Sequence, residues 1–498
     1  KNEVFKSFIG LGYHETITPS VILRNVLENP GWYTAYTPYQ AEISQGRLEA
    51  LMNFQTMVLD LTGMEIANAS LLDEATAAAE AMLMFYNSRS RADVKAGKLK
   101  FLIDENALPQ TIDVVKGRSK NLGIELIVSN IEACNVDDSF FGALIQYPDA
   151  NGHICDLESR IQKLKETNLQ VAVAADILSL ALLKAPGHFG ADVVLGSSQR
   201  FGVPMGYGGP HAAYFATRES FKRNIPGRII GISKDADNNT ALRMALQTRE
   251  QHIKRGKATS NICTAQALLA VMASMYAVYH GPNGIKGIAK HVNKLAGQLA
   301  SGLKEMGFEL GSEAFFDTVW IRNVESKKLK DLAEKHQLNF FYKSDSEVTI
   351  SFAESHTSQD INVILGLFSE LKGEKDTRDY DGIIELTQKL KRTDAILSQP
   401  IFNSYHSESK MMRYLKRLEN KDLSLVHSMI PLGSCTMKLN AASELMPITN
   451  PAFSNLHPFA PVNQAQGYHD MFKELSDALC ECTGFAGMSL QPNSGAQG

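Results

Sequence analysis

The sequence predicts an α/β fold with a mainly parallel, doubly wound sheet, followed by a smaller α/β lobe and the start of a second homologous copy. Three observations predict it. Short apolar runs alternate with helical stretches up to about residue 283, which is typical of a parallel sheet covered by helices on both faces. After Gly284 the pattern becomes that of a compact lobe, and dipeptides of the first 63 residues recur near the end of the chain.

Length and composition exclude several classes of protein. The chain has 498 residues, of which 44% are hydrophobic and 21% charged, so it has ample apolar material for a core and is too long for one domain. The net charge of −4 gives no reason to expect nucleic acid or an anionic membrane as a partner. Six cysteines do not make a disulfide framework, and Cys480 and Cys482 lack a second cluster at zinc spacing.

The first 50 residues predict an irregular N-terminal arm, because prolines and aromatic residues punctuate them. A helix is expected from about Gly46 to Leu61, where apolar residues recur at helical spacing, and an alanine-rich helix after Ala75. The apolar stretch Ile262–Tyr279 contains polar residues and predicts a buried core helix rather than a membrane span. Residues 51–283 are therefore assigned to a large α/β domain.

Six short apolar runs in the large domain predict buried strands. They are Phe101–Ile103, Ile124–Val128, Ala143–Gln146, Val171–Ala175, Val193–Leu195 and His211–Ala216. Because helical stretches separate them, most of the strands should be parallel, and a ligand should bind outside their carboxyl ends.

Residues 284–372 predict the small α/β domain. Its expected elements are a helix at Ile285–Met306, a strand within Phe315–Arg322, a helix near Leu329–His336, a strand at Glu347–Phe352 and a helix near Asp360–Leu371. Residues 373–425 predict a connection, with a charged linker at Gly373–Asp381 and a helical segment from Ile383 to Asn420.

Four dipeptides recur at a single offset along the chain. Leu11-Gly12 recurs as Leu432-Gly433, which is 421 positions later (432 − 11 = 421). The other pairs at this offset are Asn29-Pro30 with Asn450-Pro451, Gln45-Gly46 with Gln466-Gly467, and Thr62-Gly63 with Thr483-Gly484. A period this long indicates duplication of a whole fold rather than a solenoid. Residues 426–498 should thus begin a second copy, with about 340 residues of it beyond Gly498 if both copies have equal length.

A strand-end aspartate in the large domain indicates one class of chemistry. Asp176 follows the predicted strand Val171–Ala175. In the large α/β class of pyridoxal phosphate enzymes, such an aspartate pairs with the pyridine nitrogen, and a lysine past a later strand forms the Schiff base. At the lysine position this chain has Gln199, whose amide cannot form an imine. Capping the next helix is the alternative role of Asp176, and Lys184 and Lys222 are more consistent with solvated side chains than with a displaced lysine.

The two copies differ where a phosphate would bind. Ser494-Gly495-Ala496-Gln497 aligns at the same offset with Asp73-Glu74-Ala75-Thr76. Backbone N–H groups at a helix N-terminus suit a phosphate, whereas two carboxylates would repel it. A plain helix N-cap is the alternative for Ser494. We therefore expect a first copy without cofactor and a second copy that can bind one.

Five longer runs are specific enough to indicate a family. They are Gly31–Arg47, Thr248–Ile253, Ala258–Thr264, Met429–Lys438 and Gln491–Gly498. These runs resemble the P-protein of the glycine cleavage system, and the likeness spans the whole chain. The resemblance implies the type I fold of pyridoxal phosphate enzymes in two homologous halves, of which the second holds the cofactor. It also implies that glycine loses its carboxylate as CO2 and that the aminomethyl group passes to the lipoyl arm of the H-protein.

The resemblance also implies where the site residues lie. Ser494, Gly495 and Ala496 match the phosphate-binding loop, and Ser434, Thr436 and Lys438 match a segment near the cofactor. The arm resembles a contributor to the active-site entrance through Tyr36, Tyr39 and Glu42, with His14 adjacent and a structural role as its alternative. The Schiff-base lysine of the family would lie beyond Gly498, so no catalytic residue is assigned in this chain.

Different interpretations of the chain remain open. One interpretation is a fragment of the decarboxylase that is inactive alone, and another is a non-catalytic partner that completes a site in trans. An end inside the second copy favours the fragment. An independent pyridoxal phosphate enzyme with a relocated lysine is a weaker third. The resemblance further implies a homodimer and a location in the bacterial cytoplasm or the mitochondrial matrix. From charge, cysteine spacing and hydropathy, no metal, nucleic acid or membrane is expected.

Overall fold

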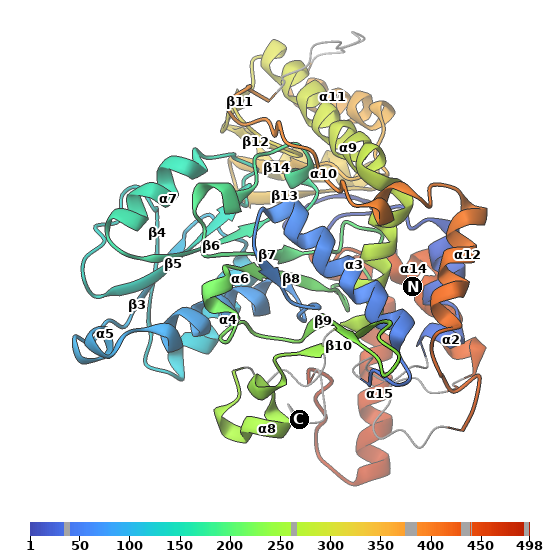
Figure 1. Ribbon diagram of the computed structural model, residues 1–498. Coiled ribbons are helices and arrows are strands. Elements are labelled where there is room, and N and C mark those ends of the chain that lie inside the picture. Colours follow the sequence, from blue (N-terminus) through green and yellow to red (C-terminus); the bar gives the residue numbers. More distant parts are fainter. Residues whose placement is uncertain (34–39, 260–265, 374–385, 430–438, 440, 493–497) are drawn as a thin grey trace.

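A seven-stranded sheet forms the centre of the large domain in the computed structural model, which describes residues 1–33, 40–259, 266–373, 386–429, 439, 441–492 and 498 (Figure 1). The strand order is β2-β8-β7-β6-β5-β3-β4. The five strands from β7 to β4 run parallel, and β8 is antiparallel to both β7 and β2. The strands are β2 Ile66–Ala67, β3 Lys100–Asp104, β4 Glu125–Ser129, β5 Phe140–Tyr147, β6 Gln170–Ala175, β7 Val193–Ser197 and β8 Ala213–Thr217.

All six predicted strands are confirmed, as β3 to β8. The predicted burial is wrong for β4, because β4 is the edge strand and exposes Glu125 and Val128 to solvent. The sequence did not predict β2 or the antiparallel hairpin of β9 (Ile229–Lys234) and β10 (Thr240–Ala245). Most hairpin side chains are partly or fully exposed, so the hairpin lacks the continuous apolar run by which the other strands were found.

Helices cover both faces of this sheet. Alternate side chains of β6 enter two separate cores, Val171 and Val173 on one face and Ala172 and Ala174 on the other. The valine face is covered by α3 (Gln45–Thr62), α7 (Leu157–Glu166) and α9 (Ala267–Glu305), and the alanine face by α4 (Glu74–Ser88) and α6 (Pro109–Lys120). This is the doubly wound arrangement that the alternating pattern predicted.

The small domain is a five-stranded sheet with helices packed on it, of order β1-β13-β14-β12-β11. Its elements are β1 Lys6–Phe8, β11 Glu309–Leu310, β12 Thr318–Arg322, α10 Ser326–Lys335, β13 Leu338–Ser344, β14 Glu347–Ser351 and α11 Ser358–Leu371. The predicted helices and strands of this lobe are present. One correction concerns the arm: its residues Lys6–Phe8 are not irregular, because they pair in parallel with β13 and so join the N-terminus to the small domain.

Helix α9 joins the two domains and combines two predicted helices. The chain turns sharply at Gly281, where φ is 61° and ψ is −176°, and Pro282 follows. A Cβ on Gly281 would lie 2.3 Å from His406 Cε1, so both the conformation and the space require glycine.

The helical segment predicted from Ile383 to Asn420 is largely wrong. Within residues 386–429, helix α12 spans only Glu408–Glu419, preceded by a short 3-10 turn at Pro400–Asn403. The residues before it are held on the large domain: the Arg392 guanidinium donates to the carbonyls of Asp60, Leu61 and Leu180 at 2.7–2.9 Å. Residues 374–385, with most of the predicted linker, lie outside the described part.

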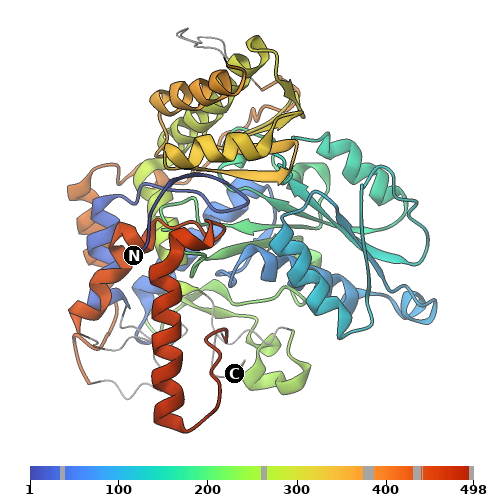
Figure 2. The same ribbon diagram turned by 180° about the vertical axis from the view of Figure 1, so that it is seen from behind.

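The repeat is visible in the secondary structure. Helix α2 (Pro30–Tyr33) has its counterpart 421 positions later in α14 (Pro451–Ser454), and α3 has its counterpart in α15 (Gln466–Thr483). The amide of Gly31 donates to Asn29 Oδ1 at 2.9 Å, and that of Ala452 to Asn450 Oδ1 at 2.9 Å. Figure 2 shows α15 extending away from the body of the molecule, whereas α3 lies within it.

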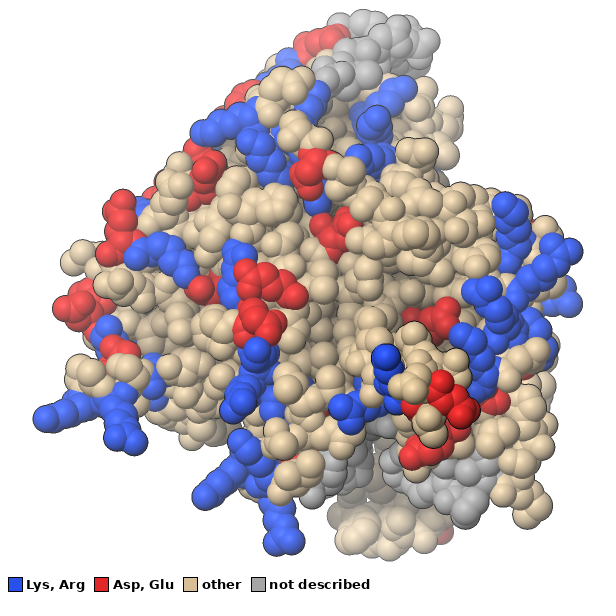
Figure 3. All heavy atoms as spheres, in the orientation of Figure 1, with Lys and Arg blue, Asp and Glu red and all other residues tan. Residues whose placement is uncertain are grey.

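The other helices of the described residues are short. They are α1 Ser20–Ile22, the π-helical turn Leu23–Leu27, α5 Arg91–Lys95, α8 Gln251–Lys254 and α13 Ala442–Leu445, with further 3-10 turns. A search of the described residues finds no helix that is both long and apolar enough to cross a membrane. On the face shown in Figure 3, Lys and Arg side chains lie in several separate places with Asp and Glu between them, as the small net charge predicts.

Candidate functional site

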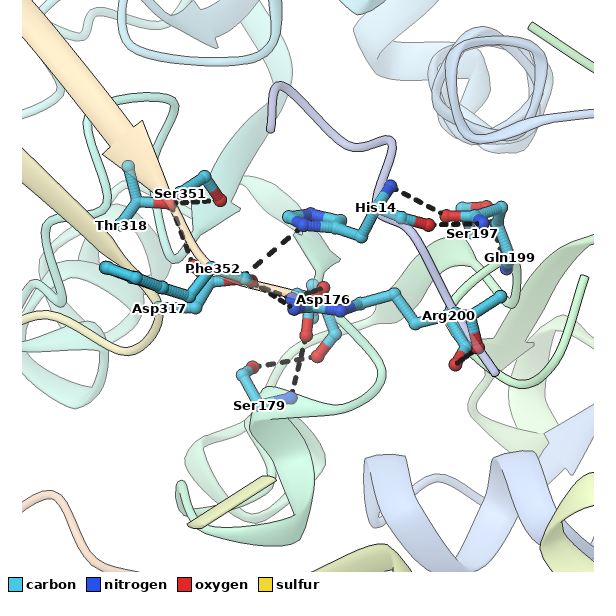
Figure 4. A network of polar contacts seen from close by, with 12 residues as sticks. His14, Asp176, Ser179, Ser197, Gln199, Arg200, Asp317, Thr318, Ser351 and Phe352 are labelled. Carbon is cyan, nitrogen blue, oxygen red and sulfur yellow. Dashed lines mark hydrogen bonds and ion pairs between the residues drawn. The ribbon is translucent and has the colours of Figure 1, made fainter. Parts of the chain in front are cut away.

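The candidate site lies where the carboxyl ends of β5, β6 and β7 meet the arm and the small domain (Figure 4). Asp176 directly follows β6 and Gln199 and Arg200 follow β7, so the parallel strands bring these side chains to one edge. His14 comes from the arm, and Asp317 from the residue before β12 of the small domain.

Asp176 already has protein partners for both carboxylate oxygens. Its Oδ1 accepts from the amide of Ser179 at 2.7 Å, at the start of the short 3-10 turn Ser179–Ala181. Its Oδ2 accepts from Arg200 Nη1 at 3.0 Å. The aspartate that would pair with a pyridine nitrogen is therefore bound to a cation of the chain itself.

Arg200 is the centre of a buried ionic network. Its Nη1 also contacts Asp317 Oδ2, and its Nη2 donates to the Phe352 carbonyl at 3.1 Å. Burial lowers the pKa of Arg200, but the two carboxylates outweigh that effect and raise the pKa above its ordinary value. The guanidinium is thus a permanent charge.

Gln199 is fully buried, and its side chain hydrogen-bonds to the arm and to the loop after β7. Its Nε2 donates to the carbonyls of His14 at 2.7 Å and Val203 at 2.6 Å. Its Oε1 accepts from the His14 amide at 3.0 Å. The amide binds the arm in both directions, and a lysine, which has no acceptor, could not reproduce these bonds.

His14 is a buried member of this network and is not exposed at an entrance. Its Nδ1 lies 3.9 Å from Asp317 Oδ2. Burial and the neighbouring Arg200 hold the pKa of His14 far below its ordinary value, so the imidazole is neutral. This environment favours the structural role that the sequence left as its alternative. Glu42 lies apart from the network, exposed in the turn before α3.

The N-terminus of α4 presents two carboxylates at the same edge. Asp73 Oδ1 accepts from the Thr76 amide at 2.6 Å as the N-cap. Glu74 accepts from Gln146 Nε2 at 3.2 Å and from the Ser197 amide at 3.3 Å. Burial, with a smaller contribution from nearby Asp176, raises the pKa of Glu74 to about 7.

These residues do not fit pyridoxal phosphate in the first copy. A phosphate at α4 would meet Asp73 and Glu74, the ring nitrogen would find Asp176 paired with Arg200, and the lysine position is a fully bonded amide. A first copy without cofactor stays a prediction, which the chemistry of these residues favours. The other assigned residues, Tyr36, Tyr39, Ser434, Thr436, Lys438, Ser494, Gly495 and Ala496, lie outside the described residues.

Sequence reasoning missed Asp317 and Phe352, which complete the network from the small domain. Asp317 lies 141 positions after Asp176, in a segment without any motif, so only the fold brings them together. It also missed His457, whose Nε2 lies 3.0 Å from the Gly10 carbonyl and whose pKa burial lowers to about 4. Through His457 the second copy packs on the arm of the first.

Several named proteins are similar to this chain. A glycine dehydrogenase (decarboxylating) from Christiangramia forsetii is 59% identical over 501 residues, covering 100% of this chain and 53% of the relative. One from Nostoc sp. is 54% identical, with 100% and 51% covered, and a mitochondrial one from Flaveria pringlei is 53% identical, with 100% and 48% covered. The chain thus spans about half the length of the curated relatives it matches.

Solved structures support the same fold. A crystal structure of glycine decarboxylase (P-protein) of the glycine cleavage system, in inhibitor-bound form, is 30% identical, with a TM-score of 0.68 over 74% of this chain and 86% of the other. A NifS-like protein matches with a TM-score of 0.52 at 14% identity, over 74% of this chain and 99% of the other, which shows the fold alone. The predicted type I fold is confirmed. A model of the family described as "Glycine cleavage system P-protein" matches residues 1–368, so the chain belongs to this family.

Proposed function

We propose that this chain is the N-terminal part of a pyridoxal phosphate-dependent glycine decarboxylase. The complete protein would release CO2 from glycine and transfer the aminomethyl group to the lipoyl arm of the H-protein. The cofactor, when bound, supplies the electron sink that decarboxylation needs. Family membership and the likeness to glycine dehydrogenases support this proposal.

The division of labour between the copies is part of the proposal. Residues 51–283, 284–372 and 373–425 form the large domain, small domain and connection of a first copy that holds no cofactor, after an arm of residues 1–50. Residues 426–498 begin the copy that binds it, with Ser494, Gly495 and Ala496 at the phosphate and Ser434, Thr436 and Lys438 nearby. Tyr36, Tyr39 and Glu42 would contribute to the entrance. A homodimer, in the bacterial cytoplasm or the mitochondrial matrix, completes the proposal.

The observation that carries this division is the state of Gln199 and Arg200. An amide with three hydrogen bonds and a guanidinium on Asp176 occupy the positions that cofactor chemistry would need. We therefore infer that residues 1–498 by themselves do not decarboxylate glycine.

Borohydride trapping tests this inference. The purified 498-residue polypeptide is incubated with pyridoxal phosphate, reduced, digested and mapped by mass spectrometry, and exchange of labelled bicarbonate into glycine is measured with lipoylated H-protein. The full-length relative from Christiangramia forsetii is the positive control. We expect no site-specific lysine adduct and no exchange in the polypeptide, and both in the control. A stoichiometric adduct on Lys184 or Lys222 with exchange would contradict the proposal and support a relocated lysine.

A further inference from the structure

The misfit between the first copy and the cofactor has a structural counterpart in how the two domains are held together. Arg200 is 6% exposed and belongs to the large domain. Two of its partners, Asp317 and the carbonyl of Phe352, belong to the small domain. Its third partner, Asp176, belongs to the large domain, so this one side chain spans the boundary.

Asp317 and Asp176 have further hydrogen-bond partners besides Arg200. Thr318 Oγ1 donates to Asp317 Oδ1 at 2.8 Å, and the Phe352 amide donates to the Asp317 carbonyl at 2.9 Å. Ser179 donates to the other oxygen of Asp176 at 2.7 Å. The guanidinium is therefore the common partner of two carboxylates from different domains, and without it the buried Asp317 and the partly buried Asp176 would bring like charges close together.

We propose that Arg200 takes the place of the cofactor's ring cation at Asp176 and uses it as a lock that fixes the small domain on the large domain. Because the guanidinium stays charged, its contacts with Asp176, Asp317 and the Phe352 carbonyl hold the two domains together without any bound ligand. Gln199 supports it by fixing the arm, whose His14 packs beside Asp317. This goes beyond the proposed function, because it assigns Arg200 a positioning role in the copy that does no chemistry.

The lock makes a prediction that ordinary core packing does not make. Asp317 connects Arg200 to the small domain, whereas Asp176 connects it only to the large domain. Losing Asp317 should therefore loosen the domain boundary more than losing Asp176, although both remove one carboxylate from the same guanidinium.

Hydrogen–deuterium exchange measured by mass spectrometry on the 498-residue chain tests the lock. The variants are Arg200→Met, Arg200→Lys, Asp317→Asn and Asp176→Asn. Arg47→Met is the matched control. Arg47 is 5% exposed, and its Nη1 lies 2.6 Å from Asp422 Oδ2, in a pair that is not part of this boundary. We expect exchange in residues 315–322 and 349–356 to become roughly tenfold faster or more in Arg200→Met and Asp317→Asn. Asp176→Asn and Arg200→Lys should show smaller increases, and Arg47→Met none in these two segments.

Two results would overturn the lock. The first is exchange at the boundary that is no faster in Arg200→Met than in Arg47→Met, which would make Arg200 an ordinary buried ion. The second is an equal effect of Asp176→Asn and Asp317→Asn, which would place the loosening within the large domain. If Arg200→Met does not fold, the comparison of Asp317→Asn with Asp176→Asn still decides the question.

Discussion

Helices α3 and α15 are the same element of the repeat in opposite environments. Both have 18 residues, lie 421 positions apart and end at a left-handed glycine, Gly63 or Gly484. In α3 most residues are buried against the core, whereas in α15 no residue is buried. The comparison teaches that local signals suffice to form and end this helix, while its contribution to stability depends on what packs against it.

The largest expected effect comes from equivalent apolar positions of the two helices. Phe54→Ala in α3 should lower the free energy of unfolding by about 3–5 kcal/mol, because the ring is fully buried and leaves a cavity. Leu475→Ala, the same position of α15, should change it by less than about 0.5 kcal/mol, because that side chain is 47% exposed. Urea denaturation of both variants measures the pair. Equal losses would refute the contrast.

A smaller difference is expected at the two terminal glycines. Both have φ near 70°, so alanine costs roughly 1 kcal/mol at either position. At Gly63 a Cβ would also lie 2.9 Å from the His188 ring, whereas at Gly484 nothing lies within 4 Å. Gly63→Ala should therefore cost about 2 kcal/mol and Gly484→Ala about 1 kcal/mol. Thermal unfolding by circular dichroism reports the order of the two, and the reverse order would argue against the described packing of His188.

The comparison continues at Glu74, whose counterpart in the second copy is Gly495. The folded-state pKa of Glu74 is about 7 and its unfolded value about 4.5, so the folded state binds the proton more tightly. The cost to folding of ionising the buried Glu74 is absent below pH 4.5 and grows as the pH rises toward 7. The Glu74→Gln variant should therefore be more stable than the parent by about 1–2 kcal/mol at pH 8, and no more stable at pH 4.5.

Chemical denaturation at several pH values measures this difference. Glu80→Gln is the control on the same helix, since burial also raises the pKa of Glu80 to about 7. The gain in stability from Glu80→Gln should be independent of the gain from Glu74→Gln. A pH-independent effect of Glu74→Gln would mean that folding does not raise the pKa of Glu74.

The smallest effect is expected at the two capping asparagines. Asn450→Ala should cost about 0.5 kcal/mol through loss of the cap of α14. Asn29→Ala should cost about 1 kcal/mol, because Asn29 Nδ2 also donates to Glu419 at 3.0 Å. Differential scanning calorimetry of the two variants is the check, and a larger loss at Asn450 would contradict the comparison.

Much of the fold could be predicted from periodicity because its strands are apolar runs that tertiary contacts merely bury. β3 and β5 to β8 were found this way. β1 was not, since Lys6–Phe8 is a strand only through its pairing with β13. The predicted helix before Pro400 failed for the converse reason, because Arg392 finds its hydrogen-bond partners on the large domain.

The candidate site was predicted in part. The strand-end position of Asp176 and the absence of a lysine at Gln199 are properties of the chain order, and they sufficed to expect a first copy without cofactor. The partners of Arg200 could not be predicted, because Asp317 and Phe352 carry no motif and come from another domain.

The sequence by itself determined the apolar strands of the large domain, the repeat of 421 positions and the residue types at the edge of the sheet, since these depend on local pattern and spacing. Only the tertiary structure decided which charges meet there. A buried guanidinium is stable only where carboxylates and carbonyls surround it, and those partners come from the large domain and the small domain together. The same reason separates α3 from α15: one helix signal recurs in both, and burial alone makes the difference.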